Sequence, residues 1–242
     1  MADALLKVEG LTACYGPAQI LFGLSLEVRP GEVVALMGRN GAGKSTTFKA
    51  LMGLLEGTRG DIRFMGEPIA GMSPYRIAKR GMGYVPEDRR IFTDLTVAEN
   101  LDIGRQAPRV WPNGSPVPQW TQETLFKLFP NLGEMAHRSG AHMSGGEQQM
   151  LTVARTLMGN PYLVLLDEPS EGVAPIIVEQ MAATIRELKA EGVSVLLSEQ
   201  NVHFAKAVSD RVYVLEKGQI QFAGTMAELV ENDAVERSYL TV

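Results

Sequence analysis

Short apolar runs alternate along the chain with segments whose apolar residues recur every three or four positions. The runs, bounded by glycine and proline, predict strands, and the longer spacing predicts helices. Strands are predicted over residues 5–9, 20–28, 32–37, 82–85, 162–166, 193–197 and 211–215, with one more within 57–66. Helices are predicted over residues 44–55, 74–80, 97–103, 121–129, 146–158, 175–189 and 202–208. The alternation of strands and helices after residue 161 indicates a parallel sheet with crossover helices.

One stretch in the middle of the chain breaks this pattern. Residues 105–122 contain four prolines, which is incompatible with a continuous helix or a central strand, so we expect a surface loop. Arg105 and Arg109 beside Trp111 and Trp120 would also suit stacking on single-stranded nucleic acid. The prolines and the acidic chain favour a packed or disordered surface loop instead, and we expect no nucleic-acid partner.

Composition narrows the class of protein. The chain has 242 residues, of which 45% are apolar, enough for one large domain or a core with a subdomain. Its 23 Lys and Arg against 28 Asp and Glu give a net charge of −5, and Cys14 is the single cysteine, which leaves no internal disulfide and no thiol cluster for zinc. Purely apolar runs are about five residues long, against roughly 20 for a bilayer span. With no secretory signal readable, we expect a soluble, intracellular chain.

The strongest chemical signal is a glycine-rich segment between a predicted strand and a predicted helix. Residues 38–45 read Gly-Arg-Asn-Gly-Ala-Gly-Lys-Ser, which matches the phosphate-binding loop (P-loop) pattern G-x-x-x-x-G-K-[ST]. Glycines let backbone N–H groups turn toward a phosphate chain, and the helix N-terminus adds positive potential. Lys44 supplies a charge for the β- and γ-phosphates and Ser45 a hydroxyl for Mg²⁺. The flanking strand and helix disfavour a chance glycine-rich turn.

A second signal is a pair of acids at the end of the predicted strand 162–166. A carboxylate at the end of a buried strand is costly unless an ion or a hydrogen bond holds it. Asp167 is therefore a candidate Mg²⁺ ligand, direct or through water, and Glu168 a candidate to orient and deprotonate an attacking water. A solvated pair that caps the strand is the alternative, which the accompanying P-loop disfavours.

A third signal precedes the predicted helix 146–158. Ser144 with Gly145 and Gly146 at a helix start can form a second anion-binding tip. On spacing alone an ordinary N-cap is the favoured interpretation. Two phosphate-gripping elements about a hundred residues apart are explained if two copies of the chain share one triphosphate, each copy giving one element.

These segments, in this order and over essentially the whole chain, resemble the ATP-binding subunits of ABC transporters. The resemblance implies an α/β fold with a P-loop NTPase core, a mostly parallel sheet with flanking helices, an antiparallel β subdomain and a helical subdomain. We expect one ATP-binding domain over residues 1–242. Within it, we expect residues 1–87 and 159–242 to form the core with the β subdomain. Residues 88–158 would form the helical subdomain, with the 105–122 loop inside it.

The resemblance also implies roles for single residues. Those that bind ATP are Tyr15, on adenine, and Gly38, Arg39, Asn40, Gly41, Ala42, Gly43, Lys44, Ser45 and Thr46. Those that hold Mg²⁺ are Ser45, Glu87 and Asp167. Those that act in catalysis are Lys44, Glu168 and Gln200. Those that form the signature segment, which acts on ATP held by the partner subunit, are Ser144, Gly145, Gly146 and Glu147.

Three positions depart from the usual family pattern. Glu87 stands where most members have Gln, and a carboxylate can also ligate Mg²⁺. Gln200 stands at the switch histidine; its amide can bond a γ-phosphate or water but cannot ionise. Ala174 replaces the usual Asp in the loop after Glu168. We expect the nearby His203 to be a helix-surface residue with no part in the site.

Segments 85–92, 169–175 and 198–201 resemble the branch that serves import of branched-chain amino acids. That branch implies ATP-driven closure of two ATP-binding subunits, identical or paralogous, which powers separate transmembrane permease subunits and, indirectly, a periplasmic solute-binding protein. The protein would be cytoplasmic and peripheral on the inner face of the cell membrane. Three alternatives stay open: a urea or amide importer ATPase, a nucleotide-gated module with little hydrolysis, and an ABC ATPase acting on DNA or ribosomes. The last class usually carries two cassettes or long coiled-coil insertions, which this chain lacks.

Overall fold

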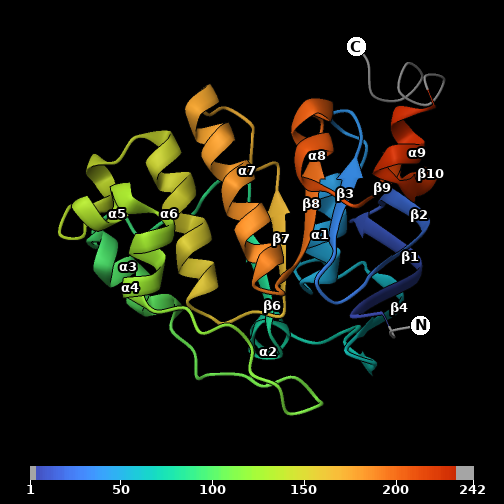
Figure 1. The fold of residues 1–242 in the computed structure, drawn as a ribbon. Coiled ribbons are helices and arrows are strands. Elements are labelled where there is room, and N and C mark those ends of the chain that lie inside the picture. The colour runs from blue at the N-terminus through green and yellow to red at the C-terminus, as the bar shows by residue number, and fades with distance from the viewer. Residues whose placement is uncertain (1–3, 233–242) are drawn as a thin grey trace.

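Two sheets organise the chain in the computed structural model, which describes residues 4–232 (Figure 1). The strands are β1 Leu6–Tyr15, β2 Ala18–Val28, β3 Val33–Met37, β4 Arg59–Phe64, β5 Glu67–Pro68, β6 Met82–Val85, β7 Leu163–Asp167, β8 Ser194–Glu199, β9 Arg211–Glu216 and β10 Gln219–Thr225. The helices are α1 Lys44–Leu51, α2 Pro74–Lys79, α3 Val97–Gly104, α4 Gln122–Leu128, α5 Pro130–Glu134, the 3₁₀ turn η1 Gly140–His142, α6 Gly145–Leu157, α7 Pro175–Ala190, α8 Val202–Val208 and α9 Met226–Val230.

The larger sheet has the strand order β10-β9-β3-β8-β7-β6. Its inner strands pair in parallel, and only β10 runs antiparallel, against β9. All residues of β3, β7 and β8 are buried, which explains why their sequences read as nearly continuous apolar runs. The expected α/β fold with a mostly parallel sheet is therefore confirmed.

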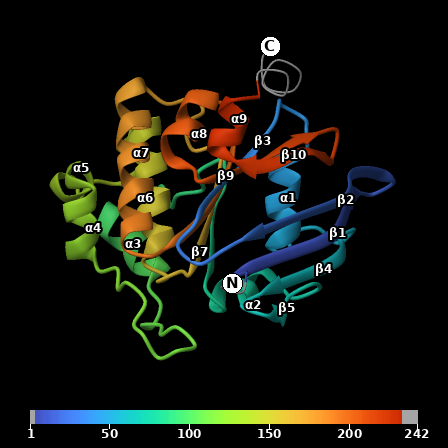
Figure 2. The same ribbon diagram turned by 45° about the vertical axis from the view of Figure 1, so that its right-hand side comes forward.

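Side chains on alternate positions of the larger sheet serve two different cores, because a strand points successive side chains to opposite faces. Val34 and Leu36 pack with Phe48 of α1 and with the smaller sheet, whose order is β2-β1-β4-β5. Val33 and Ala35 pack in the other core, with helices α3 to α9. Helix α1 thus lies between the two sheets, while α3 to α6 gather beside α7 at the end away from the smaller sheet (Figures 1 and 2).

Most predicted elements are present, with boundaries that shift. Strand β1 extends to Tyr15 instead of ending at residue 9, because it passes Gly10 through an irregularity in its pairing with β2. Helix α1 ends at Leu51 instead of residue 55, because Gly53 adopts a φ of 68° and a Cβ there would lie 2.4 Å from Met72 O. Five short elements were not predicted: β5, α5, η1, β10 and α9.

Residues 105–121 form a loop, as expected, with no more regular structure than one isolated bridge between Val110 and Pro116, and the loop is packed. The Trp111 ring lies 4.7 Å from the ring of Tyr162, centroid to centroid. Arg109 Nη1 donates to Lys79 O at 2.7 Å, at the end of α2. Trp120 is buried, and its backbone N–H donates to Asn160 Oδ1 at 2.8 Å. Two of the aromatic rings that stacking on nucleic acid would need are thus engaged inside the protein.

The longest helix in the described part of the chain is α7, with 16 residues. None of the helices between residues 4 and 232 combines the length and the apolar composition that crossing a bilayer requires.

Gly218 lies where the larger sheet contacts β2 of the smaller sheet, and a substitution there tests how close this contact is. It turns β9 into β10 with φ 76°, its N–H donates to Ala42 O and its carbonyl accepts from Phe22 N–H. A Cβ there would lie 1.8 Å from Ile20 O, whereas at Gly192, with φ 84°, it would meet nothing within 4 Å. We expect Gly192→Ala to lower the free energy of unfolding by about 1 kcal/mol through backbone strain, and Gly218→Ala by about 3 kcal/mol because collision is added. Urea denaturation measures both, and equal losses would contradict the close approach.

Candidate active site

The predicted site residues come together where three parallel strands end. In-register pairing places Met37 opposite Glu199 and Asp167 opposite Ser198. The segments that leave β3, β7 and β8 therefore begin side by side at one edge of the sheet. Open α/β sheets bind ligands at this carboxyl edge.

The P-loop joins β3 to α1. Gly41 and Gly43 have φ values of 79° and 113°, which residues other than glycine rarely adopt. At Gly38 a side chain is excluded by crowding, because a Cβ there would lie 2.4 Å from Leu215 O. No side chain caps the start of α1, and its first turn holds no acid. The first amides of α1 and the helix dipole are therefore left for an anion.

Lys44 and Glu168 form a buried ion pair that the sequence did not predict. Lys44 Nζ lies 3.0 Å from Glu168 Oε1, and the two side chains are 3% and 6% exposed. The same ammonium donates to Gly38 O at 2.7 Å and Arg39 O at 3.1 Å. Because burial of charge is costly, each partner depends on the other for compensation. Removing either one leaves an uncompensated charge beside the P-loop.

Asp167 is held by hydroxyl groups. Its Oδ1 accepts from Ser45 at 3.0 Å and from Ser198 at 2.7 Å, and its Oδ2 accepts from Tyr84 at 3.1 Å. Burial raises the pKa of Asp167, while these hydrogen bonds oppose the rise. Ser45 and Asp167 are thus adjacent hard oxygen donors, the ligand type that Mg²⁺ prefers.

Ser198 and Tyr84 are site residues that sequence reasoning missed. Ser198 also accepts from Glu168 N–H, at 3.0 Å, and so positions both acids. Burial, followed by the nearby Asp167 carboxylate, raises the pKa of Tyr84 far above its usual value. The available signal was a polar residue one position before the end of each of the two apolar strands that flank β7.

Glu168 has a φ of 48°. A third acid, Glu171, follows it three residues later. A hydrogen bond to the Glu168 carboxyl, together with burial, raises the pKa of Glu171 to about 7. The carboxyl groups of the two residues therefore lie close together near Lys44.

Tyr15 and Glu87 share a cleft with Asp167. The cleft measures about 490 Å³, and Tyr84 lines it as well. Tyr15, at the end of β1, is 45% exposed. The structure thus brings together the predicted adenine contact and two of the three predicted Mg²⁺ ligands.

Gln200 follows β8 directly, and its N–H donates to Glu199 Oε2 at 3.1 Å. His203 is exposed on α8, so its expected place on the helix surface is confirmed.

Ser144 is the N-cap of α6. Helix α6 lies on the other side of β7 from α1 (Figures 1 and 2). Its N–H donates to Glu147 Oε2 at 2.6 Å and Glu147 N–H donates back to Ser144 Oγ, which forms a capping box. The N-cap interpretation is therefore confirmed as local structure. Ser144 is exposed, so its tip is open to a second molecule.

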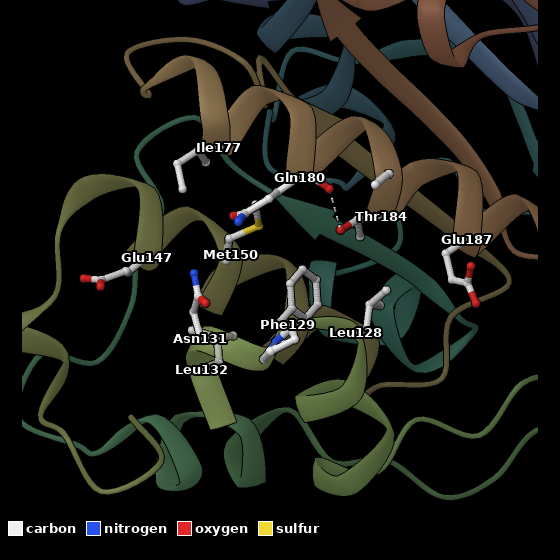
Figure 3. A pocket seen from close by; sticks show the side chains of 12 residues that line it. Leu128, Phe129, Asn131, Leu132, Glu147, Met150, Ile177, Gln180, Thr184 and Glu187 are labelled. Atoms are coloured by element: carbon white, nitrogen blue, oxygen red, sulfur yellow. Dashed lines mark hydrogen bonds between the residues drawn. The ribbon is translucent and has the colours of Figure 1, made fainter. Parts of the chain in front are cut away.

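Helix α6, which carries this tip, packs in the core through Leu151 and Val153, but its contact with α7 is incomplete. A Cβ at Gly146 would lie 2.7 Å from Ile177 Cγ1, so glycine allows α6 to approach α7 there. Just beyond, a cavity of about 300 Å³ separates α5 and α6 from α7, floored by Phe129 and Met150 (Figure 3). This seam is less tightly packed than a protein core.

Comparison with known proteins agrees with this geometry. The sequence profile described as ABC transporter matches residues 21–171. The chain is 42% identical to the high-affinity branched-chain amino acid transport ATP-binding protein BraG of Pseudomonas aeruginosa, over 98% of this chain and 99% of that one. It is 35% identical to the lipopolysaccharide export system ATP-binding protein LptB of Haemophilus influenzae, over 98% and 97%.

Solved structures show the same fold. A nucleotide-free ATP-binding cassette from an ABC transporter superposes with a TM-score of 0.79 at 29% identity, covering 95% of this chain and 94% of that one. A cassette in its ADP conformation gives 0.78 at 28% identity, covering 96% and 94%. ATPase subunits of this kind dimerise and work with transmembrane permease subunits. The chain therefore belongs to the ABC transporter family, as an ATP-binding cassette with ATPase activity.

Proposed function

We propose that this cassette hydrolyses ATP held by residues 38–46, with Glu168 acting on the attacking water. The observation that carries the proposal is that two consecutive P-loop residues contact two consecutive acids at 3.0 Å each. Lys44 contacts Glu168, and Ser45 contacts Asp167. Ser45 and Asp167, with Glu87 from the adjoining cleft, would hold Mg²⁺, which neutralises charge on the phosphates. Tyr15 would stack on the adenine.

The Lys44–Glu168 pair suggests how binding prepares the base. A γ-phosphate is a stronger partner for the Lys44 ammonium than the backbone carbonyls and the single carboxylate that it contacts now. When the ammonium turns to the phosphate, Glu168 loses its cation and becomes free to accept a proton from water. Gln200 would orient that water or the γ-phosphate through its amide. Catalysis then rests on positioning and charge stabilisation.

The exposed Ser144 tip supports a shared site. Residues 144–147 would close over ATP on the P-loop of a second ATP-binding subunit, identical or paralogous. We take residues 88–158 as a helical subdomain of a single domain over 1–242, whose remainder, 1–87 and 159–242, is the core. The open seam beside α7 suits movement of that subdomain during closure.

A groove between α2 and α3 has the surface that a contact with the permease subunits would need. Tyr75, Phe92 and Ile103 are 65%, 47% and 52% exposed, and all three line one groove between α2 and α3. Arg155 stacks on Phe92, with its guanidinium carbon 5.1 Å from the ring centroid, and its buried Nη1 has no hydrogen-bond partner among the described residues. An apolar surface with an unsatisfied donor fits a cytosolic permease segment that brings a carbonyl or a carboxylate.

For cargo, we propose branched-chain or other hydrophobic amino acids, delivered to the permease by a periplasmic solute-binding protein. Support comes from the 42% identity to BraG and from segments 169–175 and 198–201. The cassette would act at the inner face of the cell membrane. The LptB similarity makes export the competing direction, and a urea or amide importer the competing cargo.

Binding and hydrolysis are separable by two substitutions. We expect Lys44→Ala to lose ATP affinity by more than roughly 100-fold, since the phosphate loses its main charge partner. Glu168→Gln should keep ATP affinity and lose phosphate release. Titration with a fluorescent ATP analogue and a phosphate-release assay measure the two effects, with Lys127→Ala on exposed α4 as the charge-matched control. Equal, background-level release from wild type and Glu168→Gln would support a nucleotide-gated module with little hydrolysis.

Ser144→Arg tests the shared site. A bulky cation at the tip should abolish the ATP-dependent dimer while ATP affinity of the single chain changes less than about twofold, because the tip does not belong to its own P-loop. Sedimentation velocity in a Glu168→Gln background measures the dimer. Thr121→Arg is the matched control, because it removes a capping box from α4 and adds the same charge. An ATP-dependent dimer of Ser144→Arg would refute the shared site.

Uptake tests direction and cargo. Cells without this protein should lose most uptake of radiolabelled leucine, and the wild-type gene, but not Glu168→Gln, should restore it. Loss of urea uptake with normal leucine uptake would assign the cassette to an amide importer. Normal uptake of both with failed lipopolysaccharide export would reverse the direction.

A further inference from the structure

We propose that Glu199 is a positioning residue that locks the segment after Glu168 and the Gln200 segment in one arrangement for hydrolysis. The inference rests on the ATPase activity and on the proposed role of Glu168. Glu199 is the last residue of β8 and is 1% exposed. It is too deeply buried to reach solvent or to act as a surface charge.

The carboxylate of Glu199 accepts hydrogen bonds from two different segments. Oε1 accepts from Ser170 N–H at 3.1 Å, two residues after Glu168. Oε2 accepts from Gln200 N–H at 3.1 Å and Asn201 N–H at 3.0 Å. Each oxygen therefore serves one segment, and the rigid carboxylate fixes their separation.

The backbone of the same residue reaches a third segment. Glu199 O accepts from Gly38 N–H at 3.2 Å, at the first position of the P-loop. The P-loop contact uses the main chain and survives any substitution at position 199. The two side-chain contacts do not, so mutation can separate ATP binding from the arrangement of the other two segments.

Only a carboxylate fits these contacts. Burial raises the pKa of Glu199, while the hydrogen bonds to Ser170 and Asn201 oppose the rise. An amide has one acceptor oxygen, and its NH₂ group would face an N–H donor on one side or the other. A glutamine would thus lose the hydrogen bond to Ser170 or those to the Gln200 segment. The released segment would shift, and a small misplacement of groups around the reacting water lowers the rate of hydrolysis strongly.

The test compares Glu199→Gln and Glu199→Asp with wild type. For Glu199→Gln we expect kcat to fall roughly 10- to 100-fold, with ATP affinity within about threefold of wild type because Lys44 and the P-loop amides are unchanged. Glu199→Asp keeps both acceptors and the charge on a shorter arm, so it should retain more of kcat. Ser194→Ala is the control: Ser194 is buried at the far end of β8 and accepts from Gly31 N–H at 2.8 Å. It should lose stability and keep kcat.

Hydrogen exchange gives a readout independent of turnover. The amides of Ser170, Gln200 and Asn201 should exchange faster in Glu199→Gln than in wild type, and Ser194→Ala should leave them unchanged. If Glu199→Gln fails to fold, Glu199→Asp decides: its shorter arm should speed exchange at Ser170 or at Gln200 and Asn201, and wild-type exchange at all three amides would overturn the proposal. Unchanged kcat in folded Glu199→Gln, or ATP affinity that falls in parallel with kcat, overturns the proposal. Absent phosphate release in wild type would instead refute the function on which it rests.

Discussion

The parallel ladder that joins β3, β8 and β7 is the constraint on which the site depends. Backbone hydrogen bonds fix the register of these strands, so Met37 ends opposite Glu199, and Asp167 ends opposite Ser198, one residue earlier. Residues that are more than a hundred positions apart in sequence then lie within hydrogen-bonding distance, as Ser45 and Asp167 do. A shift of one residue in any of these strands would turn its apolar side chains to the wrong core and separate the acids from the P-loop.

The site concentrates charge that the fold buries. Lys44, Asp167, Glu168 and Glu199 are each less than 10% exposed, a state that is costly without partners. Each has partners of its own: a cation facing an anion, hydroxyl groups on Asp167, backbone N–H groups on Glu199. Such a network is preorganised, because each of these side chains is already held by other groups of the protein. The same dependence makes each member sensitive to removal of its neighbour.

The sequence located most elements because their patterns are local. The strands β6 and β7 and the helices α6, α7 and α8 were predicted to within one residue at each end, since continuous apolar runs and helical spacing are strong signals. The end of α1 was misplaced because a close approach of Gly53 to Met72 O decides it. Strand β10 was missed because it alternates between half-buried and exposed residues and is stabilised by its pairing with β9.

By itself, the sequence determined the chemistry: a P-loop, two acids at the end of an apolar strand, and a serine–glycine helix start. Those signals are short and local, because each depends on residue types at fixed spacing. Only the tertiary structure decided that Lys44 pairs with Glu168, that Ser198 and Tyr84 hold Asp167, and that Glu199 joins two segments. Except for the contacts of Glu199 with Gln200 and Asn201, these contacts join residues that are 29 to 124 positions apart in the sequence. No local pattern encodes which strands become neighbours in a sheet.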